Sequence, residues 1–314
     1  MGGCADPGGP DHELLVRVGA RRESVPVEGQ FTDHRMLQVP GADGDGCSTG
    51  LGRALATAVL ERGWNAVVTA RSVDKVQDIA DAHPATALAL ALDVTDSTQV
   101  TSAVEQAEAR FGSIDVLVNN AGHGYRSAVE EADDREVAAL FATNFHGPVA
   151  LIKAVLPSMR ARREGAIVNV SSIAGQYSAP GSGYYSATKF ALEGMSDALR
   201  KEVGPLGIKV LVVEPGAFRT DFAGRSLQQS PAAIADYAQT AGLRRKENDT
   251  THGHQPGDPA RAPQVVFDAL ASRETPFRLL LGSDAVAVIR DELAARTKEL
   301  DAWETAGRTT DFPA

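Results

Sequence analysis

The sequence predicts an α/β fold: a single doubly wound domain, with a parallel sheet and helices on both of its faces. Past residue 47 the chain alternates helix-like and strand-like segments, which is typical of such a sheet. A glycine-rich turn opens the first of these helices. Because no composition break or long linker divides residues 47–300, we expect one domain rather than two.

The elements are assigned from hydrophobic periodicity. Short apolar runs bounded by turn residues are interpreted as buried strands, and longer periodic segments as helices. The long helix contains Pro148 and Pro157 as candidate kink positions. In chain order we expect a helix at 51–61, a strand at 65–70, a short helix at 74–80, a strand at 87–92, a helix at 97–111, a strand at 114–118, the long helix at 134–160, a strand at 166–170, a helix at 185–203, a strand at 208–213, a helix at 260–271, a strand at 277–281 and a last helix at 284–302.

The N-terminal part departs from this order. Residues 1–34 are rich in glycine, proline and charge, and we expect an irregular extension ahead of a domain at 35–314. Residues 40–46 cannot form a central strand, because proline loses a ladder bond and unpaired carboxylates are costly there. The only strand candidate is 35–39. Two explanations stay open: a natural extension with a remodelled loop, or a frame shift or misplaced start that replaced residues 1–45.

Bulk properties narrow the function classes. A net charge of −10 argues against nucleic acid or an anionic membrane as the main partner. No apolar run reaches the roughly 20 residues that span a bilayer, and no secretory signal is recognised. Cys4 and Cys47 make no disulfide framework, and His252 and His254 lack zinc-site spacing. We therefore expect a soluble cytoplasmic protein without a metal site.

Tyr185 and Lys189 form the most informative motif. Four residues apart, they share one face of the predicted helix. A free phenol titrates near pH ~10, and an ammonium group one turn away lowers that pKa and gives a usable general acid/base. Ser172 lies upstream, just after the apolar run 166–170. A Tyr-x-x-x-Lys spacing alone is weak evidence, because chance copies on solvated helix faces are common, and its surroundings here strengthen it.

At these residues the chain resembles the short-chain dehydrogenase/reductase family, whose members are Rossmann-fold oxidoreductases. The resemblance runs from about Cys47 to the C-terminus, and its other elements follow in the family's order. They are the glycine turn Gly46-Cys47-Ser48-Thr49-Gly50-Leu51-Gly52, the run Asn119-Asn120-Ala121-Gly122, Asn144, and Pro215-Gly216-Ala217-Phe218-Arg219-Thr220.

The resemblance implies a hydride transfer between a nicotinamide cofactor and a ketone, aldehyde or secondary alcohol. Tyr185 would be the general acid/base and Ser172 would orient the substrate oxygen. Lys189 would lower the pKa of the tyrosine and hold ribose hydroxyls, and Asn144 would hold a water of the proton relay. Residues 218–258 would cover a partly apolar small-molecule substrate.

The resemblance also implies a cofactor site at the glycine turn, where backbone N–H groups and a helix start favour a pyrophosphate. Arg71 follows the second strand, at the position where an acid would select NAD. An arginine can pair with the 2′-phosphate of NADP, so NADP is favoured over NAD. The expected cofactor-binding residues are Gly46, Ser48, Gly50, Leu51, Gly52, Arg71, Asp93, Val94, Asn120, Ala121, Gly122, Tyr185, Lys189, Pro215, Gly216, Phe218 and Thr220.

One departure from the family keeps a second interpretation open. Asp45 stands where the family has a threonine before glycine, and the buried strand that should precede it is not apparent at 40–45. A catalytically impaired or non-catalytic dinucleotide-binding relative is therefore the alternative. By analogy with the family, a homodimer or homotetramer is expected to pair through the long helix and the helix that carries Tyr185.

Overall fold

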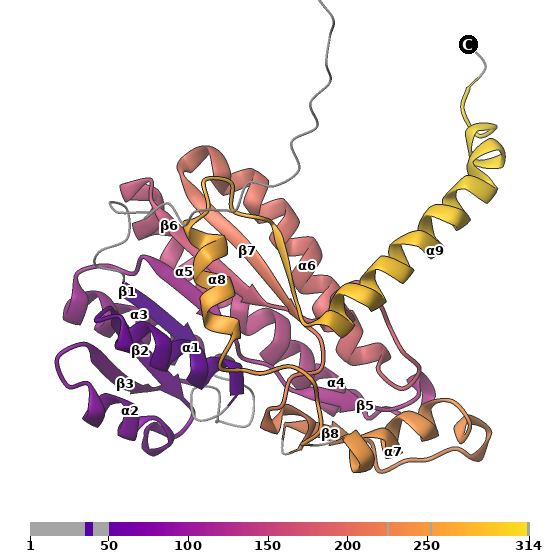
Figure 1. Ribbon diagram of the computed structural model, residues 1–314, viewed down its shortest axis with the longest axis horizontal. Coiled ribbons are helices and arrows are strands. Elements are labelled where there is room, and N and C mark those ends of the chain that lie inside the picture. Colours follow the sequence, from indigo (N-terminus) through magenta and orange to yellow (C-terminus); the bar gives the residue numbers. More distant parts are fainter. Residues whose placement is uncertain (1–34, 40–49, 225, 252, 313–314) are drawn as a thin grey trace, which may run out of the picture. The chain divides into compact units, whose positions relative to one another are not determined.

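The computed structural model of this protein describes residues 35–39, 50–224, 226–251 and 253–312 (Figure 1). The expected extension 1–34, the residues Gly46 and Ser48 of the glycine turn, and Asp45 lie outside this part of the chain.

The described residues form a seven-stranded parallel sheet with the strand order β3-β2-β1-β4-β6-β7-β9. The strand order reverses between β1 and β4, as in a doubly wound fold, so the predicted fold class is confirmed. The strands are β1 (Arg35–Val39), β2 (Asn65–Ala70), β3 (Ala87–Ala91), β4 (Val116–Asn119), β6 (Gly165–Val170), β7 (Ile208–Pro215) and β9 (Arg278–Leu281).

The strand candidate at 35–39 is confirmed, and it occupies the middle of the sheet. Met36 is in register with Ala66 of β2 on one side and with Val116 of β4 on the other. The side chain of Met36 is buried in the core. An apolar residue in this register supplies the burial that a central strand needs, which the proline and carboxylates at 40–45 could not.

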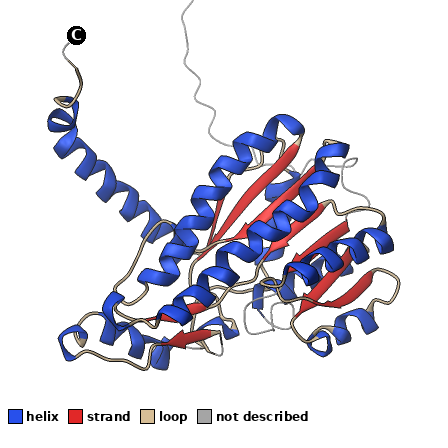
Figure 2. Ribbon diagram, turned by 180° about the vertical axis from the view of Figure 1, so that it is seen from behind, coloured by secondary structure: helices blue, strands red, loops and turns tan. Residues whose placement is uncertain are grey.

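Helices cover both faces of the sheet (Figures 1 and 2). The predicted helices are present with shifted ends, and the one at 74–80 is divided into a 3₁₀ turn and a short α-helix. The helices are α1 (Gly50–Glu61), α2 (Gln77–Ala82), α3 (Ser97–Phe111), α4 (Asp134–Phe141), α5 (Gly147–Arg162), α6 (Gly183–Val203), α7 (Ala241–Thr251), α8 (Ala262–Ala271) and α9 (Ser283–Arg308).

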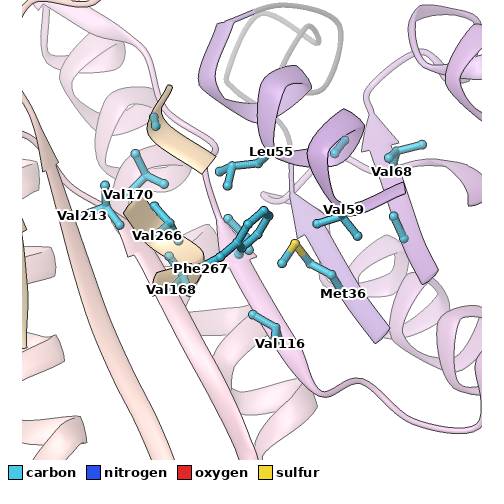
Figure 3. Close-up of a cluster of buried hydrophobic side chains, with 14 of the residues drawn as sticks. Met36, Leu55, Val59, Val68, Val116, Val168, Val170, Val213, Val266 and Phe267 are labelled. Atoms are coloured by element: carbon cyan, nitrogen blue, oxygen red, sulfur yellow. The ribbon is translucent and has the colours of Figure 1, made fainter. Parts of the chain in front are cut away.

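Alternating strand residues build the two halves of the core, because successive side chains of a strand point to opposite faces. Val68, Val116 and Val168 pack with residues of α1 and α8, such as Val59 and Phe267 (Figure 3). On the other face the cluster consists of Val67, Leu117 and Ile167 together with residues of α3, α5 and α6. This burial on both faces explains why the strands appear as continuous apolar runs.

The long helix expected at 134–160 is interrupted. Between α4 and α5 the residues Ala142–His146 form a π-helical turn, a feature that often marks a functional site. The whole helical stretch 134–162 is 29 residues long, and its most apolar window has a mean hydropathy of 1.3. By length and composition it could therefore span a membrane, which the sequence analysis had not recognised. Its buried residues, among them Leu151 and Met159, pack in the core beside the sheet.

Residues 218–258 are more ordered than their composition predicts. β8 (Leu227–Gln229) pairs in parallel with β5 (Gly124–Arg126), forming a second, two-stranded sheet. α7 follows in the same segment. Strands of three residues are too short to show a period, so the sequence could not indicate them. Their pairing places this segment beside the chain that leaves β4.

Candidate active site

The predicted catalytic residues gather at the carboxyl ends of the central strands, where ligands bind in doubly wound sheets. Ser172 lies two residues beyond the end of β6, and Tyr185 and Lys189 are on α6. Asn144 lies in the π-helical turn between α4 and α5. The positions come from distant parts of the chain, and hydrogen bonds described below connect them.

Tyr185 is buried, and the hydroxyl of Ser172 lies beside its phenol. Its ring packs against Phe222 with ring centroids 5.8 Å apart. Burial raises the pKa of Tyr185, and the hydrogen bond from Ser172 and the positive charge of Arg126 oppose that rise without cancelling it. The sequence analysis expected a lowered pKa caused by Lys189. In the structure the direction is upward, because desolvation of the phenol outweighs its polar neighbours.

Lys189 is almost completely buried, with its Nζ 5.9 Å from the centroid of the Tyr185 ring. The ammonium group donates a hydrogen bond of 2.9 Å to the backbone oxygen of Val170, the last residue of β6. Burial lowers the pKa of Lys189 to about 8, and the negative charge of Glu193 opposes this shift. Lys189 therefore titrates close to neutral pH, where a small change in local charge alters its ionisation.

Asn144 ties the chain after β4 to α6. Its Oδ1 accepts a hydrogen bond from the backbone N–H of His123 (3.0 Å), and its Nδ2 donates to the backbone oxygen of the same residue (2.9 Å). Nδ2 also donates to Thr188 Oγ1 at 3.1 Å, and this hydroxyl donates to the backbone oxygen of Tyr185 at 2.7 Å. Asn144 thus positions the helix that carries Tyr185; that it holds a water stays a prediction.

Gly122 completes this group. A Cβ at this position would lie 3.3 Å from Lys189 Nζ and 3.4 Å from Asn144 Oδ1. These are tighter than ordinary van der Waals contacts, so glycine lets the chain after β4 approach the two polar side chains. The structure therefore brings together three residues that the sequence analysis had assigned separately to catalysis and to cofactor binding.

The glycine turn and the segment after β7 also meet. Gly50 begins α1 with a φ of 64°, and a Cβ there would lie 3.1 Å from Cβ of Thr220. Asp284, in the first turn of α9, accepts a hydrogen bond of 2.7 Å from the backbone N–H of Ala217. Its carboxylate also occupies the space that a Cβ of Gly216 would need. The sequence analysis missed Asp284, whose only signal was a carboxylate at a helix start.

The remaining predicted cofactor residues lie around this edge of the sheet. Arg71 is exposed, directly after β2. Asp93 accepts hydrogen bonds from the backbone N–H (2.9 Å) and hydroxyl (2.7 Å) of Thr95, so it caps the turn after β3. The buried Val94 packs against Gly147. Leu51 and Gly52 lie in the first turn of α1, Asn120 and Ala121 directly follow β4, and Pro215 and Phe218 lie at and just after the end of β7.

Arg126, on β5, is a second residue that the sequence analysis missed. Its guanidinium donates to the hydroxyl of Ser182, which precedes α6, and its charge acts on Tyr185. No motif identified it, because the two-stranded sheet that places it beside the tyrosine is a tertiary feature. Within the described residues, no group of histidine, cysteine and carboxylate side chains has the arrangement of a metal site.

Comparisons with known proteins agree with this geometry. Residues 45–231 match the family model of the short chain dehydrogenases. An oxidoreductase named BOA17 of Botryotinia fuckeliana is 39% identical over 242 residues, which cover 77% of this chain and 88% of the relative. A 3-ketodihydrosphingosine reductase of Bacteroides thetaiotaomicron is 38% identical over 244 residues, covering 76% and 86%.

Solved structures show the same fold. A short-chain dehydrogenase from Streptomyces avermitilis superposes with a TM-score of 0.81 at 42% identity, covering 88% of this chain and all of that one (100%). A metagenomic short-chain oxidoreductase in complex with NADP has a TM-score of 0.60 at 26% identity, covering 79% and 96%. One from Burkholderia phymatum in complex with NAD has a TM-score of 0.71 at 23% identity, covering 83% and 94%. The chain thus belongs to the short-chain dehydrogenase/reductase family of oxidoreductases.

Proposed function

We propose that this protein is an NADP-preferring carbonyl reductase, with Tyr185 as its general acid. The observation that carries the proposal is the burial of Tyr185 beside the hydroxyl of Ser172, with the ammonium group of Lys189 on the same helix face. Because burial raises the pKa of Tyr185, the phenol stays protonated at neutral pH. A protonated phenol suits proton donation to a developing alkoxide, which is the reductive direction.

The residues present fit a dinucleotide cofactor. Gly50 opens α1 with a positive φ, and a glycine turn at a helix start suits a pyrophosphate group in this fold. The buried ammonium group of Lys189 makes one hydrogen bond to the protein and has further N–H donors for ribose hydroxyls. When bound, NADPH supplies the hydride; the protein supplies position and charge.

In this reaction each residue has a defined task. Ser172 donates to the substrate carbonyl oxygen and holds it beside the phenol of Tyr185. The phenol gives its proton to that oxygen as the carbonyl carbon accepts a hydride. The positive charges of Lys189 and Arg126 stabilise the phenolate that is left until a proton returns from solvent.

Cofactor choice rests on Arg71. Its exposed position after β2, with no carboxylate before Asp74, favours the 2′-phosphate of NADP over the free hydroxyl of NAD. Relatives of the fold bind either cofactor, as the complexes with NADP and NAD illustrate. Replacing Arg71 with aspartate is expected to reverse the preference.

The surroundings of Tyr185 favour a partly apolar substrate. Phe222 packs on the tyrosine ring, and Leu227 and Phe222 lie where a side chain at Gly124 would be. A medium-sized ketone or aldehyde with an apolar body fits these neighbours. The 38% identical relative is named a 3-ketodihydrosphingosine reductase, which supports a keto compound as the substrate.

The test combines binding and turnover. Purified protein is titrated with NADPH and with NADH by nicotinamide fluorescence, and a panel of apolar ketones and aldehydes is then assayed. Tyr185→Phe is expected to bind NADPH normally and to lose turnover by a factor of about 100 or more. Tyr184→Phe is the control, since this hydroxyl bonds only the backbone oxygen of Val129 among the described residues. Equal turnover of Tyr185→Phe and wild type would refute the assignment.

The alternative function is that of a catalytically impaired or non-catalytic relative that still binds a dinucleotide. Cofactor binding without turnover would favour this alternative, whereas a protein that binds neither NADPH nor NADH would have lost the cofactor site as well. The reason for this alternative was the apparent absence of a first strand, and β1 is that strand.

We further propose a cytoplasmic homodimer or homotetramer that pairs through α4, α5 and α6. The exposed side chain of Phe190 on α6 supports pairing through this helix. The test is the molar mass of Phe190→Glu measured by light scattering, which we expect to fall to that of a monomer.

A further inference from the structure

A cluster of charged and polar side chains lies next to the predicted catalytic residues. No member of this cluster has a role in the proposed reaction. Glu193 is on α6 and Glu214 is near the end of β7; their side chains are exposed by 4% and 0%. Arg278 on β9 and Gln176, which follows the turn after β6, complete it. Carboxylates this deeply buried are costly unless every charge and oxygen has a partner.

The partners account for one oxygen of each carboxyl group. Arg278 Nε donates to Glu193 Oε2 at 2.9 Å and lies 3.5 Å from Glu214 Oε1. Gln176 Nε2 donates to Glu214 Oε1 at 2.6 Å. The other two oxygens, Glu193 Oε1 and Glu214 Oε2, are buried and receive no hydrogen bond from the described residues. One guanidinium therefore faces two carboxyl groups, each with an oxygen unused.

One proton on this pair of carboxyl groups would remove the repulsion between two negative charges and would supply a hydrogen-bond donor. Both carboxyl groups face the same nitrogen, Nε of Arg278, at 2.9 and 3.5 Å, so two ionised carboxylates there would repel each other. Burial and the charge of Glu193 raise the pKa of Glu214 well above its usual range. A carboxyl pair that keeps one proton has a single negative charge, which matches the single charge of Arg278. This is the way that paired buried carboxyls are kept stable near neutral pH.

The cluster touches two elements of the active site. Glu193 lies one helical turn beyond Lys189, and its negative charge opposes the fall in the pKa of that ammonium group. It also packs against the turn that begins at Ser172, because a Cβ at Gly175 would lie 2.8 Å from Glu193 Cγ. Gln176 ends the same turn, and its backbone oxygen accepts a hydrogen bond from Arg296 of α9.

We infer that Glu193 and Glu214 hold one shared proton, and that this pair is a positioning element of the active site, through which the charge on Lys189 and the turn of Ser172 are set. The charged groups that face the pair are Lys189 on its own helix and Arg278 on β9, while Arg296 reaches it through Gln176. The shared proton is argued from the contacts of Arg278 and the two unused oxygens; the positioning role rests on the proposed function.

The proton is measured first, without turnover. Infrared spectra of the full-length protein, with glutamate labelled by ¹³C, are expected to show the carbonyl stretch of a protonated carboxylic acid at pH 7. This band should disappear in Glu214→Gln, which keeps the volume and a hydrogen-bonding group, and persist in Glu202→Gln, an exposed position on the same helix. A wild-type spectrum without the band, or a band that survives in Glu214→Gln, would overturn the shared proton.

The positioning role is measured by pH profiles. Glu193→Gln removes the charge that supports the protonated form of Lys189, so the alkaline limb of kcat should move down by about 1 pH unit. Glu214→Gln imitates the protonated form of Glu214, so the alkaline limb of its kcat profile should stay at the wild-type pH. The control Glu202→Gln should also leave this limb in place. Equal profiles of Glu193→Gln and wild type would overturn the role. Absence of any reductase activity would refute the proposed function and leave the infrared result standing.

Discussion

The guanidinium of Arg245 lies 2.5 Å from the carboxylate of Glu131, and both side chains are largely buried. Glu131 lies just after β5, whereas Arg245 is on α7, more than a hundred residues later. The same carboxylate accepts backbone N–H bonds from Ala128 (2.8 Å) and Ile234 (2.7 Å). One acidic side chain therefore fastens the segment proposed to cover the substrate to the body of the domain.

Glu131→Gln is expected to loosen this covering segment. Removing one partner of a buried, hydrogen-bonded ion pair costs about 3 kcal/mol, because the remaining charge stays buried. The loss should appear as earlier urea unfolding and as faster proteolysis within 226–251. Asp197→Asn is the control, since its pairs with Arg200 and Lys201 are solvent-accessible and such surface pairs contribute little to stability. Equal effects of the two substitutions would contradict the anchor.

The same carboxylate predicts a pH dependence. Burial raises the pKa of Glu131, but the N–H groups of Ile234 and Ala128 and the charge of Arg245 lower it further, so its net direction is downward from 4.5. Its contribution to stability is therefore complete above the pKa of the unfolded chain and is lost as the pH falls through the lower folded value. Urea unfolding midpoints below pH 4.5 should decline less in Glu131→Gln than in wild type; parallel declines would contradict this.

Gly122→Ala is expected to reduce turnover, because the added methyl group would press on Lys189 Nζ and Asn144 Oδ1 at 3.3 and 3.4 Å. A displaced ammonium group loses its position relative to Tyr185, and misplacements of this kind cost about 10- to 100-fold in rate. Gly194→Ala is the matched control: nothing lies within 4 Å of its Cβ, and alanine in a helix stabilises by about 1 kcal/mol. The turnover of both variants is measured by steady-state kinetics. A Gly122→Ala variant with wild-type turnover would show that the close approach of residue 122 to Lys189 and Asn144 is unimportant for the reaction.

Arg126→Gln is expected to raise the pKa of Tyr185, because the positive charge that opposes the effect of burial is removed. In alcohol oxidation the tyrosine must accept a proton, so the rising limb of the pH profile should move to higher pH. Lys153→Gln, an exposed position on α5, controls for the change in net charge. A rising limb that stays in place in Arg126→Gln would exclude Arg126 from the electrostatics of the phenol.

Asp284→Ala is expected to weaken NADPH binding by about tenfold, equivalent to roughly 1.4 kcal/mol. The substitution removes the acceptor of the Ala217 N–H, and with it the contact that holds residues 215–220, which include expected cofactor-binding positions, against α9. Fluorescence titration measures the affinity, and Asp291→Asn, exposed on the same helix, is the control. Unchanged affinity in Asp284→Ala would assign the carboxylate to helix capping alone.

Much of the fold was predictable because it depends on local pattern. The strands at 65–70 and 166–170 are buried on both faces, so their apolar runs are unbroken in the sequence. The strand at 35–39 was predictable only by exclusion, since proline and carboxylates ruled out its neighbours. The π-helical turn at 142–146 was not predictable, because its residues have no period that differs from that of the α-helices beside it.

The sequence by itself determined the family and pointed to the candidate catalytic residues, because the spacing of Tyr185 and Lys189 on one helix face is a local property. Only the tertiary structure decided the electrostatics. The direction in which the pKa of Tyr185 is shifted depends on the burial of the phenol and on the charge of Arg126. A two-stranded sheet brings Arg126 to the tyrosine from another part of the chain. The burial of Glu193 and Glu214, which are ordinary surface residue types in the sequence, is likewise decided by the tertiary structure. Desolvation and long-range contacts set these charges, and neither can be inferred from neighbouring residues.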